Sequence, residues 1–136
     1  MTQTPNFQLN QWSPEDYVRR TDFNADNAKI DAALNQKGNC RIVTGSYTGT
    51  GKYGADAPNT LTFEASPKAV FLICGNWRGW FIRGSGSATI QFGGSSASIS
   101  LSWGERSITW YGYDSAEKQL NTKGHTCYYF ALLTND

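Results

Sequence analysis

The sequence predicts a mainly β fold, an antiparallel β-sandwich of jelly-roll type preceded by a short N-terminal helical segment. Three observations support this prediction. The 136 residues include 14 Gly, 5 Trp, 7 Tyr and 7 Phe but only 17% charged residues, a composition that favours strands and tight turns. From Cys40 onward, short β-branched and aromatic runs alternate with Gly, Ser and Asn. No helical stretch interrupts these runs, which is typical of an all-β domain.

The composition of the chain changes near Gly38, where we place a domain boundary. Residues 1–38 are rich in Asn, Asp, Ala and Gln, and we expect them to form a helical segment for assembly or attachment. Residues 39–136 are expected to form the β-sandwich binding domain. At 136 residues the chain leaves no room for another full domain.

Two helix-start patterns lie in the first segment. Ser13 and Pro14, followed by two acidic residues, predict one or two helical turns, because serine caps a helix and proline suits its first position. A longer helix is predicted over residues 22–35, with Gly38 as its stop signal.

The longer helix has a narrow apolar stripe with the four–three–four spacing of a coiled-coil seam. The stripe consists of Phe23, Asn27, Ile30 and Leu34. We predict that these residues mediate oligomerisation, with Asn27 fixing the register or the number of strands. Packing of the stripe against the chain's own β domain explains the same pattern, and the sequence favours neither alternative.

Eight strands are expected in the second segment. They span residues 40–48, 60–66, 69–74, 77–83, 88–92, 97–103, 107–111 and 126–133. The run from Ala97 to Trp103 alternates most clearly, with Ile99, Leu101 and Trp103 on one face and serines on the other. Glycine-containing turns separate the runs, so we expect consecutive strands to pair as hairpins or to cross between two sheets.

Charge and hydropathy exclude several classes of partner. Lys and Arg number 12 against 11 Asp and Glu, so the net charge of +1 creates no field that would attract nucleic acid. Residues 1–10 lack a signal-peptide pattern, and no apolar run is long enough to span a bilayer. We therefore expect no nucleic-acid partner, no membrane insertion and synthesis in a reducing cytoplasm.

The three cysteines are Cys40, Cys74 and Cys127. Their odd number and the absence of a C-x-x-C pair favour buried free thiols over a disulfide. A zinc site is also disfavoured, since only one histidine is present to complete a ligand set. We predict neither a metal nor a cofactor.

Residues 21–34, TDFNADNAKIDAAL, resemble the N-terminal segment of tail-fibre and minor tail structural proteins of phages and prophages of Gram-positive bacteria. The lead before this helix, with Phe7, Trp12 and Pro14, is similar to theirs. A second resemblance covers the start of the β domain, at residues 45–51, 58–63 and 67–73. It implies a virion tail component made in the host cytoplasm, a homotrimer that contacts other tail proteins through its helical end and places its β domain outward.

Three patterns suggest catalysis or nucleotide binding, and we interpret each as structural. Gly49 to Gly54 reads GxGxxG, but another strand follows instead of the helix that a phosphate loop opens, so we expect a hairpin loop. His125 follows a turn without any nearby nucleophile motif. The acidic residues of the β domain show no pairing typical of glycoside hydrolysis.

The aromatic residues near turns are the strongest candidates for a binding site. Flat rings beside amide, guanidinium and carboxylate groups suit sugars. The residues predicted to be exposed for this purpose are Asn76, Trp77, Arg78, Tyr113 and Asp114. Trp80, Trp103 and Trp110 are assigned mainly to the core, the first because it alternates with Ile82. Contact between subunits is an alternative use for any exposed ring.

The sequence thus predicts a non-enzymatic receptor-binding module of a phage tail fibre that recognises a bacterial surface glycan. A purely structural virion or injection-particle protein is the first alternative. A polysaccharide-processing enzyme is the second and the weaker one, because no catalytic constellation is evident.

Overall fold

The computed structural model describes residues 1–37 and 40–135, and the chain divides into two compact units, residues 1–39 and 40–136. The predicted boundary and helix stop at Gly38 lie outside the described residues. Each unit is described by itself below.

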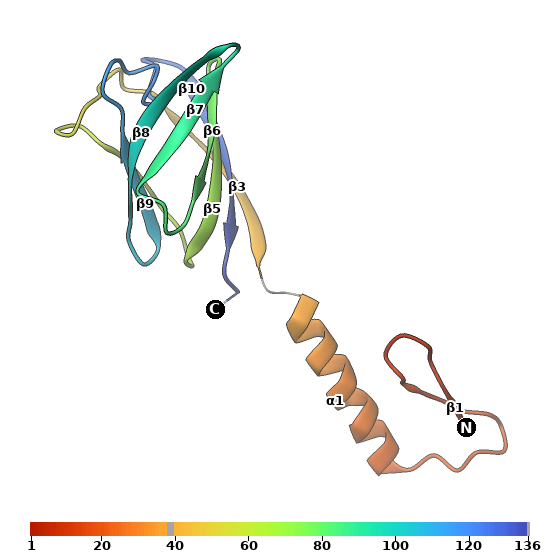
Figure 1. The fold of residues 1–136 in the computed structure, drawn as a ribbon. Helices are drawn as coiled ribbons and strands as arrows, with labels where there is room; N and C mark the ends of the chain where they lie inside the picture. The colour runs from red at the N-terminus through yellow and green to blue at the C-terminus, as the bar shows by residue number, and fades with distance from the viewer. Residues whose placement is uncertain (38–39, 136) are drawn as a thin grey trace. The chain divides into compact units, whose positions relative to one another are not determined.

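The N-terminal unit is a small hairpin followed by one helix (Figure 1). Strand β1 (Thr2–Gln3) pairs antiparallel with β2 (Asn10–Gln11), and α1 spans Arg20–Lys37. The helix is confirmed and is longer than predicted, whereas both strands were missed because two residues carry no alternation. At Ser13 the predicted helix is replaced by a single turn, in which the Asp16 amide donates to the Ser13 carbonyl at 3.0 Å.

Hydrogen bonds join the hairpin to α1. The amide of Asn10 donates to the carboxylate of Asp26 at 3.1 Å, and the Lys29 ammonium donates to the Gln8 carbonyl at 2.6 Å. These contacts use one side of the helix and leave Phe23, Ile30 and Leu34 exposed.

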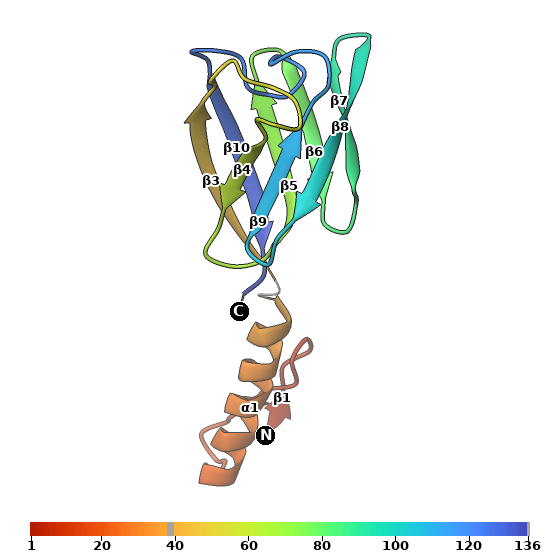
Figure 2. The ribbon, with the colours of Figure 1, turned by 90° about the vertical axis from the view of Figure 1, so that its left-hand side faces the viewer.

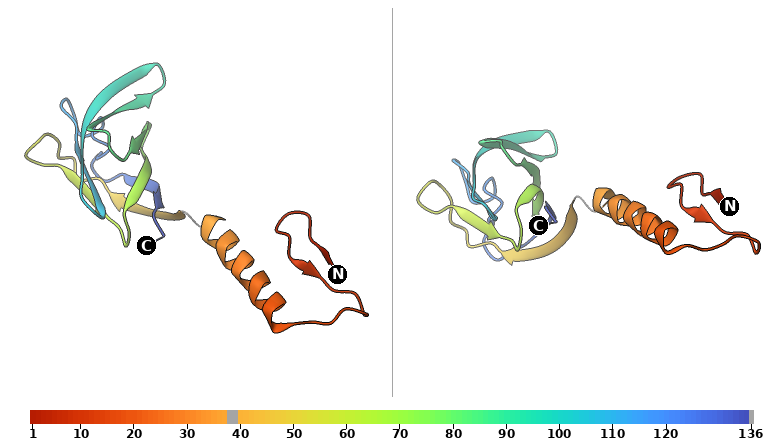
Figure 3. Two further views of the ribbon diagram at one scale, coloured as in Figure 1. Left: turned by 60° about the horizontal axis from the view of Figure 1, so that its bottom comes forward. Right: turned by 90° about the horizontal axis from the view of Figure 1, so that it is seen from below.

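The C-terminal unit contains the eight predicted strands. They are β3 (Arg41–Thr48), β4 (Asn59–Thr62), β5 (Pro67–Cys74), β6 (Trp77–Ile82), β7 (Ser87–Phe92), β8 (Ser95–Trp103), β9 (Ser107–Tyr111) and β10 (Thr126–Leu133). All pair antiparallel in the order β3-β10-β5-β6-β7-β8-β9-β4. They form one sheet that curls into a half-barrel (Figures 2 and 3).

The predicted β-sandwich is therefore wrong, although the mainly β class is confirmed. Strands β5 to β9 follow one another as hairpins, so each adds to the same sheet instead of starting a second layer. The curl lets the inner face pack against itself: the ring of Trp110 lies 6.0 Å from that of Tyr47 and 5.4 Å from that of Phe81. One strongly curled sheet thus encloses a core without a partner sheet.

The inner face of the sheet holds the hydrophobic core. Its buried residues include Val70, Leu72, Phe81, Ile90, Ile99, Leu101, Ile108, Trp110, Ala131 and Leu133. They sit at alternate positions of their strands, as the pleat requires. The predicted inward face of β8 is confirmed, with Ile99 and Leu101 buried and Trp103 partly buried.

The outer face of the sheet has two chemically different halves. On β3, β10, β5 and β6 it is largely apolar, with Ile42, Tyr128, Phe130, Leu132, Phe71, Ile73, Trp80 and Ile82. On β7, β8, β9 and β4 it is largely hydroxylated, with Ser87, Thr89, Ser96, Ser98, Ser100, Ser102, Ser107, Thr109, Thr60 and Thr62. We call these surfaces the aromatic half and the hydroxyl half.

One end of the sheet, which we call the loop end, carries the longest connections. The β5–β6 and β7–β8 turns meet there with the loops of residues 49–58 and 112–125 (Figure 2, top). Gly75 opens the β5–β6 turn with φ of 59°, a backbone conformation that favours glycine. Strand β3 begins, and β10 ends, at the opposite end of the sheet.

Candidate functional site

The predicted binding residues lie at or near the loop end. Asn76 is in the β5–β6 turn, Arg78 is on the outer face of β6, and Tyr113 and Asp114 are in the 112–125 loop; all four are exposed. The predicted exposure of Trp77 is wrong, since this side chain is only 9% exposed.

The interpretation of the two tryptophans on β6 is reversed by the structure. Trp77 points inward with Phe81, and Trp80 points outward with Ile82, against the assignment of Trp80 to the core. Both faces of the strand carry large apolar residues, and the one charged residue, Arg78, shares the outer face with Trp80 and Ile82. Trp110 is buried as predicted, and the ring nitrogen of the partly buried Trp103 donates to the Ser85 carbonyl at 2.9 Å.

A small cleft opens at the loop end. It has a volume of about 190 Å³ and is lined by Cys74, Gly75, Asn76, Trp77, Phe92, Glu117, Thr122 and His125. The edge of Trp77 faces Phe92, with ring centroids 5.8 Å apart. One carboxylate and one imidazole reach the cleft, which therefore lacks the paired acids of a glycosidase.

Exposed rings from several segments surround this end. Tyr53 comes from the 49–58 loop, Phe92 from the end of β7 and Tyr113 from the 112–125 loop. Tyr113 packs edge-on against Tyr111 at 5.5 Å, and the neighbouring Asp114 carboxylate accepts from Lys118 at 2.9 Å. The loop end therefore exposes aromatic rings next to hydrogen-bonding groups.

A buried glutamine fixes the loops beneath these rings. The side-chain oxygen of Gln119 accepts from the amides of Gly54 at 2.8 Å and Gly112 at 2.9 Å. Its nitrogen donates to the Ala57 carbonyl and the Asn59 side chain, both at 2.8 Å. Gln119 is fully buried with all four hydrogen bonds made, so it holds the 49–58 loop to the 112–125 loop.

Asn121, two residues after Gln119, also joins the 112–125 loop to the 49–58 loop. Its oxygen accepts from the Thr50 amide at 3.0 Å, and its nitrogen donates to the Thr50 hydroxyl at 2.7 Å and to the Lys52 carbonyl at 2.9 Å. The hydroxyl of Tyr47 donates to the Leu120 carbonyl, and burial raises the pKa of this phenol well above its ordinary value. The loop end is consequently rigid, which sequence reasoning did not foresee.

The glycine-rich segment at residues 49–54 is no hairpin loop. Strands β3 and β4 lie at opposite edges of the sheet, so their connection crosses the open side of the half-barrel. Gly49 passes so close to the Thr122 carbonyl that a side chain there would collide with it. Strand β4 follows this loop, and the helix that a phosphate site requires is absent from residues 49–66.

The prediction of buried free thiols is wrong for two cysteines. Cys74 on β5 and Cys127 on β10 are buried but directly opposite each other, with Cα atoms 4.3 Å apart, and form a disulfide. Their pairing depends on two strands that are 53 residues apart in sequence, which spacing rules do not reveal. Cys40 is free.

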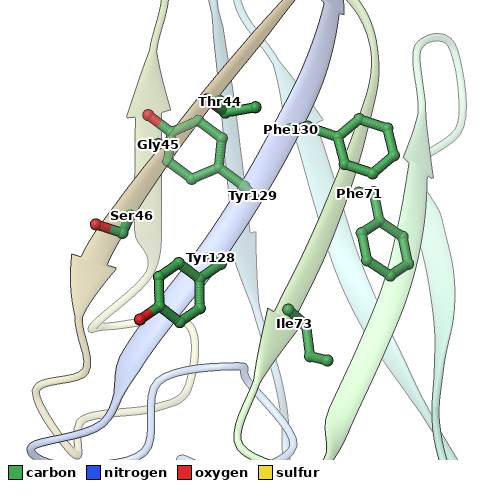
Figure 4. Close-up of a pocket in the computed structure, with 8 residues that line it drawn as sticks. All are labelled: Thr44, Gly45, Ser46, Phe71, Ile73, Tyr128, Tyr129 and Phe130. Carbon is green, nitrogen blue, oxygen red and sulfur yellow. The ribbon is translucent and has the colours of Figure 1, made fainter.

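The aromatic half was also missed as a surface. Phe71, Trp80 and Phe130 form a cluster with ring centroids 5.0 to 5.3 Å apart. Beside it, a groove of about 420 Å³ is lined by residues 44–46, Phe71, Ile73 and residues 128–130 (Figure 4). The signal was present in the continuous apolar runs of β5 and β10, which indicate strands with two apolar faces.

The proposed oligomerisation stripe is exposed in the N-terminal unit, Asn27 included. Ile30 and Leu34 also line an apolar groove of about 210 Å³ together with Phe7, Leu9 and Ala33. Oligomer formation itself stays a prediction.

Within residues 1–37 and 40–135, three or more His, Cys, Asp or Glu side chains never gather as a metal site would need. In the same ranges no helix has the length and apolarity to cross a membrane. Comparisons of the chain with protein-family models, with curated proteins and with solved structures give no match.

Proposed function

We propose that this protein is a non-enzymatic binding module of a phage tail fibre, and that its loop end recognises a neutral, polar ligand such as a bacterial surface glycan. The observation that carries the proposal is that three separate segments each expose an aromatic ring at the same end of the sheet, where hydrogen bonds hold the loops together. Tyr53, Phe92 and Tyr113 provide these rings.

The chemistry around the rings favours a sugar over a charged ligand. Aromatic faces pack on the apolar faces of sugar rings, while hydroxyl groups need planar hydrogen-bonding partners. Asn76, Asp114 and Glu117 provide such partners at this end. The net charge of +1 offers no general attraction for polyanions.

The rigidity of the loops supports binding without a closing step. Gln119 and Asn121 have their side-chain hydrogen bonds satisfied within the protein, so they hold the loops and are not free to act on a ligand. Preorganised loops lose little conformational entropy on binding. The cleft of about 190 Å³ is smaller than the roughly 300–1,000 Å³ of sites for whole small molecules, which suits one terminal group of an extended ligand.

The tail-fibre setting rests on the resemblance of residues 21–34 and of the start of the β domain. Attachment through the N-terminal unit fits a β unit whose first strand begins at the end away from the binding loops. Several copies in a homotrimer would raise avidity even when each site is weak. The Cys74–Cys127 disulfide suits a virion surface outside the cell, where disulfides persist.

The proposal is tested by binding of the full-length protein to host cells and to a glycan array. Tyr53→Ala and Tyr113→Ala should each reduce binding by about tenfold, because a stacked ring contributes roughly 1 to 1.5 kcal/mol. Tyr17→Ala is the control, since Tyr17 is a tyrosine of the N-terminal unit that is 82% exposed, against 48% for Tyr53 and 63% for Tyr113. Unchanged binding by both loop variants would refute the site, and release of reducing ends from host polysaccharide would refute the non-enzymatic assignment.

A further inference from the structure

We infer that the aromatic half of the sheet is an interface, and that its occupant is a second copy of this chain. This contact is separate from the helix stripe of the N-terminal unit. It also does not depend on whether the loop end binds a glycan.

The aromatic half exposes large apolar side chains at neighbouring positions. Trp80 is 48% exposed, Ile82 54%, Tyr128 58% and Ile42 68%. Ile42 pairs across the strands with Leu132, Leu132 with Ala69, and Ala69 with Ile82, so the apolar positions form a continuous row over β3, β10, β5 and β6. Single exposed apolar residues are ordinary, whereas a contiguous patch marks a contact surface.

The size of the patch approaches that of a stable interface. With about 150–250 Å² for each aromatic side chain and somewhat less for isoleucine, the four most exposed residues alone present on the order of 400 Å². The partly buried Phe71, Ile73, Phe130 and Leu132 extend this area. A standard interface buries about 800 Å² on each partner, so a copy placed here would contact mostly apolar surface at the centre.

The patch contains both exposed rings and a groove. Phe71 and Phe130 line the groove of about 420 Å³ together with Ile73 and Tyr128 (Figure 4), and both rings also pack against Trp80. Around the three-fold axis of a homotrimer the patch of each copy faces its neighbours, so the exposed Trp80 ring of one copy meets the groove of the next. A surface with both parts fits its own copy.

The distribution of charge favours a second copy over a charged partner. Arg78 is the one ionised side chain on the outer face of β6, and the outer positions 42, 44, 71, 73, 80, 82, 128, 130 and 132 carry no formal charge. A strongly acidic or basic partner would find no complement there. Two identical surfaces of this kind do not repel each other, because their centres are uncharged.

The exposed edge of the sheet adds to this inference. Strand β3 has eight residues and pairs only with β10, so its outer edge is unpaired within the described residues. Ile42, the most exposed apolar residue of the patch, lies on this strand. Exposed apolar side chains on an edge strand favour association, and a copy seated on the aromatic half would cover that of Ile42.

Sedimentation equilibrium of the full-length protein over about 1 to 100 µM tests the inference. The test variant is Trp80→Arg with Ile82→Arg, and the matched control is Ser96→Arg with Ser98→Arg, which adds the same charge at the same spacing to exposed positions of one strand of the hydroxyl half. Far-ultraviolet circular dichroism and the thermal midpoint verify folding of both. Leu34→Arg measures the contribution of the helix stripe separately.

We expect an oligomeric wild-type protein whose dissociation constant rises at least tenfold in the Trp80/Ile82 variant and stays within twofold in the control. A wild-type protein that is monomeric throughout this range would overturn the inference and leave the patch to another occupant. Equal dissociation constants of a folded test variant and its control would also overturn it. Glycan binding retained by the Trp80/Ile82 variant would show that the loop end acts independently of this contact.

Discussion

The two halves of the outer face belong to one sheet, yet one exposes hydroxyl groups and the other exposes large apolar side chains. The hydroxyl half places serines and threonines at successive outward positions of β7, β8, β9 and β4. The aromatic half places tryptophan, phenylalanine and isoleucine at equivalent positions of β5, β6 and β10. Behind both halves lies the same apolar inner face.

This difference distinguishes the side chains that folding requires from those that serve contacts with other molecules. A half-barrel needs one apolar face, and the hydroxyl half shows that water is a sufficient neighbour for the other face. The apolar side chains of the aromatic half add little to the core because they point away from it. We therefore attribute them to contact with a second copy and attribute ligand binding to the loop end.

The largest effects are expected on the inner face, where the two halves should behave alike. Leu72→Ala in β5 and Ile99→Ala in β8 should each lower the free energy of unfolding by about 2–5 kcal/mol, because both side chains are completely buried. Denaturant titration measures these losses. A loss below 1 kcal/mol at one site would show that the core is confined to one half.

A smaller loss is expected at the loop end, which belongs to neither half of the outer face. Gln119→Leu keeps the volume but leaves the amides of Gly54 and Gly112 without their acceptor. We expect a loss of about 1–3 kcal/mol in the free energy of unfolding. Ligand binding should weaken because the loops separate, while the sedimentation behaviour should stay that of the wild type.

On the outer face, substitutions in either half should change the free energy of unfolding only slightly. Ile82→Thr and Thr89→Ile should each change the free energy of unfolding measured in dilute solution by about 0.5 kcal/mol or less, since both side chains are exposed. Association should weaken only for Ile82→Thr. A large folding defect in this variant would indicate that the aromatic half stabilises the monomer.

The smallest effect is a pH dependence at Tyr47, on the inner side of β3. Burial raises the pKa of its phenol above the ordinary value of 10.0, so the folded protein keeps the proton that the unfolded chain loses. The stability contributed by this group is complete below about pH 10 and is lost as the pH rises further. Tyr47→Phe should make alkaline unfolding, followed by circular dichroism, less steep.

The local pattern of the chain was sufficient to predict the strands but not the architecture. Alternation located β8, and β9 and β10 were predicted to the residue, because each depends on neighbours in sequence. A sandwich and a curled sheet require the same strands, and only the pairing of β3 with β10 and of β4 with β9 distinguishes them. The Cys74–Cys127 disulfide was missed for the same reason.

The candidate site was predicted in part. Tyr113, Asp114 and Asn76 follow turn signals, and turns lie at the ends of strands, so their exposure was predictable. The burial of Trp77 was not, because both faces of β6 carry large apolar residues; Gly79, on the inner face with Trp77, lies so close to Ile90 on β7 that a side chain there would collide with it. The role of Gln119 arises from loops distant in sequence and left no local signal.

Hydroxyl-radical footprinting of the full-length protein tests the central claim most directly, because it reports on both surfaces in one sample. At concentrations where the protein associates, we expect slow oxidation of Trp80 and Tyr128, fast oxidation of Tyr113, and recovery of the first two rates on dilution. Oxidation of Trp80 at the same rate in concentrated and dilute samples would contradict the assignment of the aromatic half as a contact between copies.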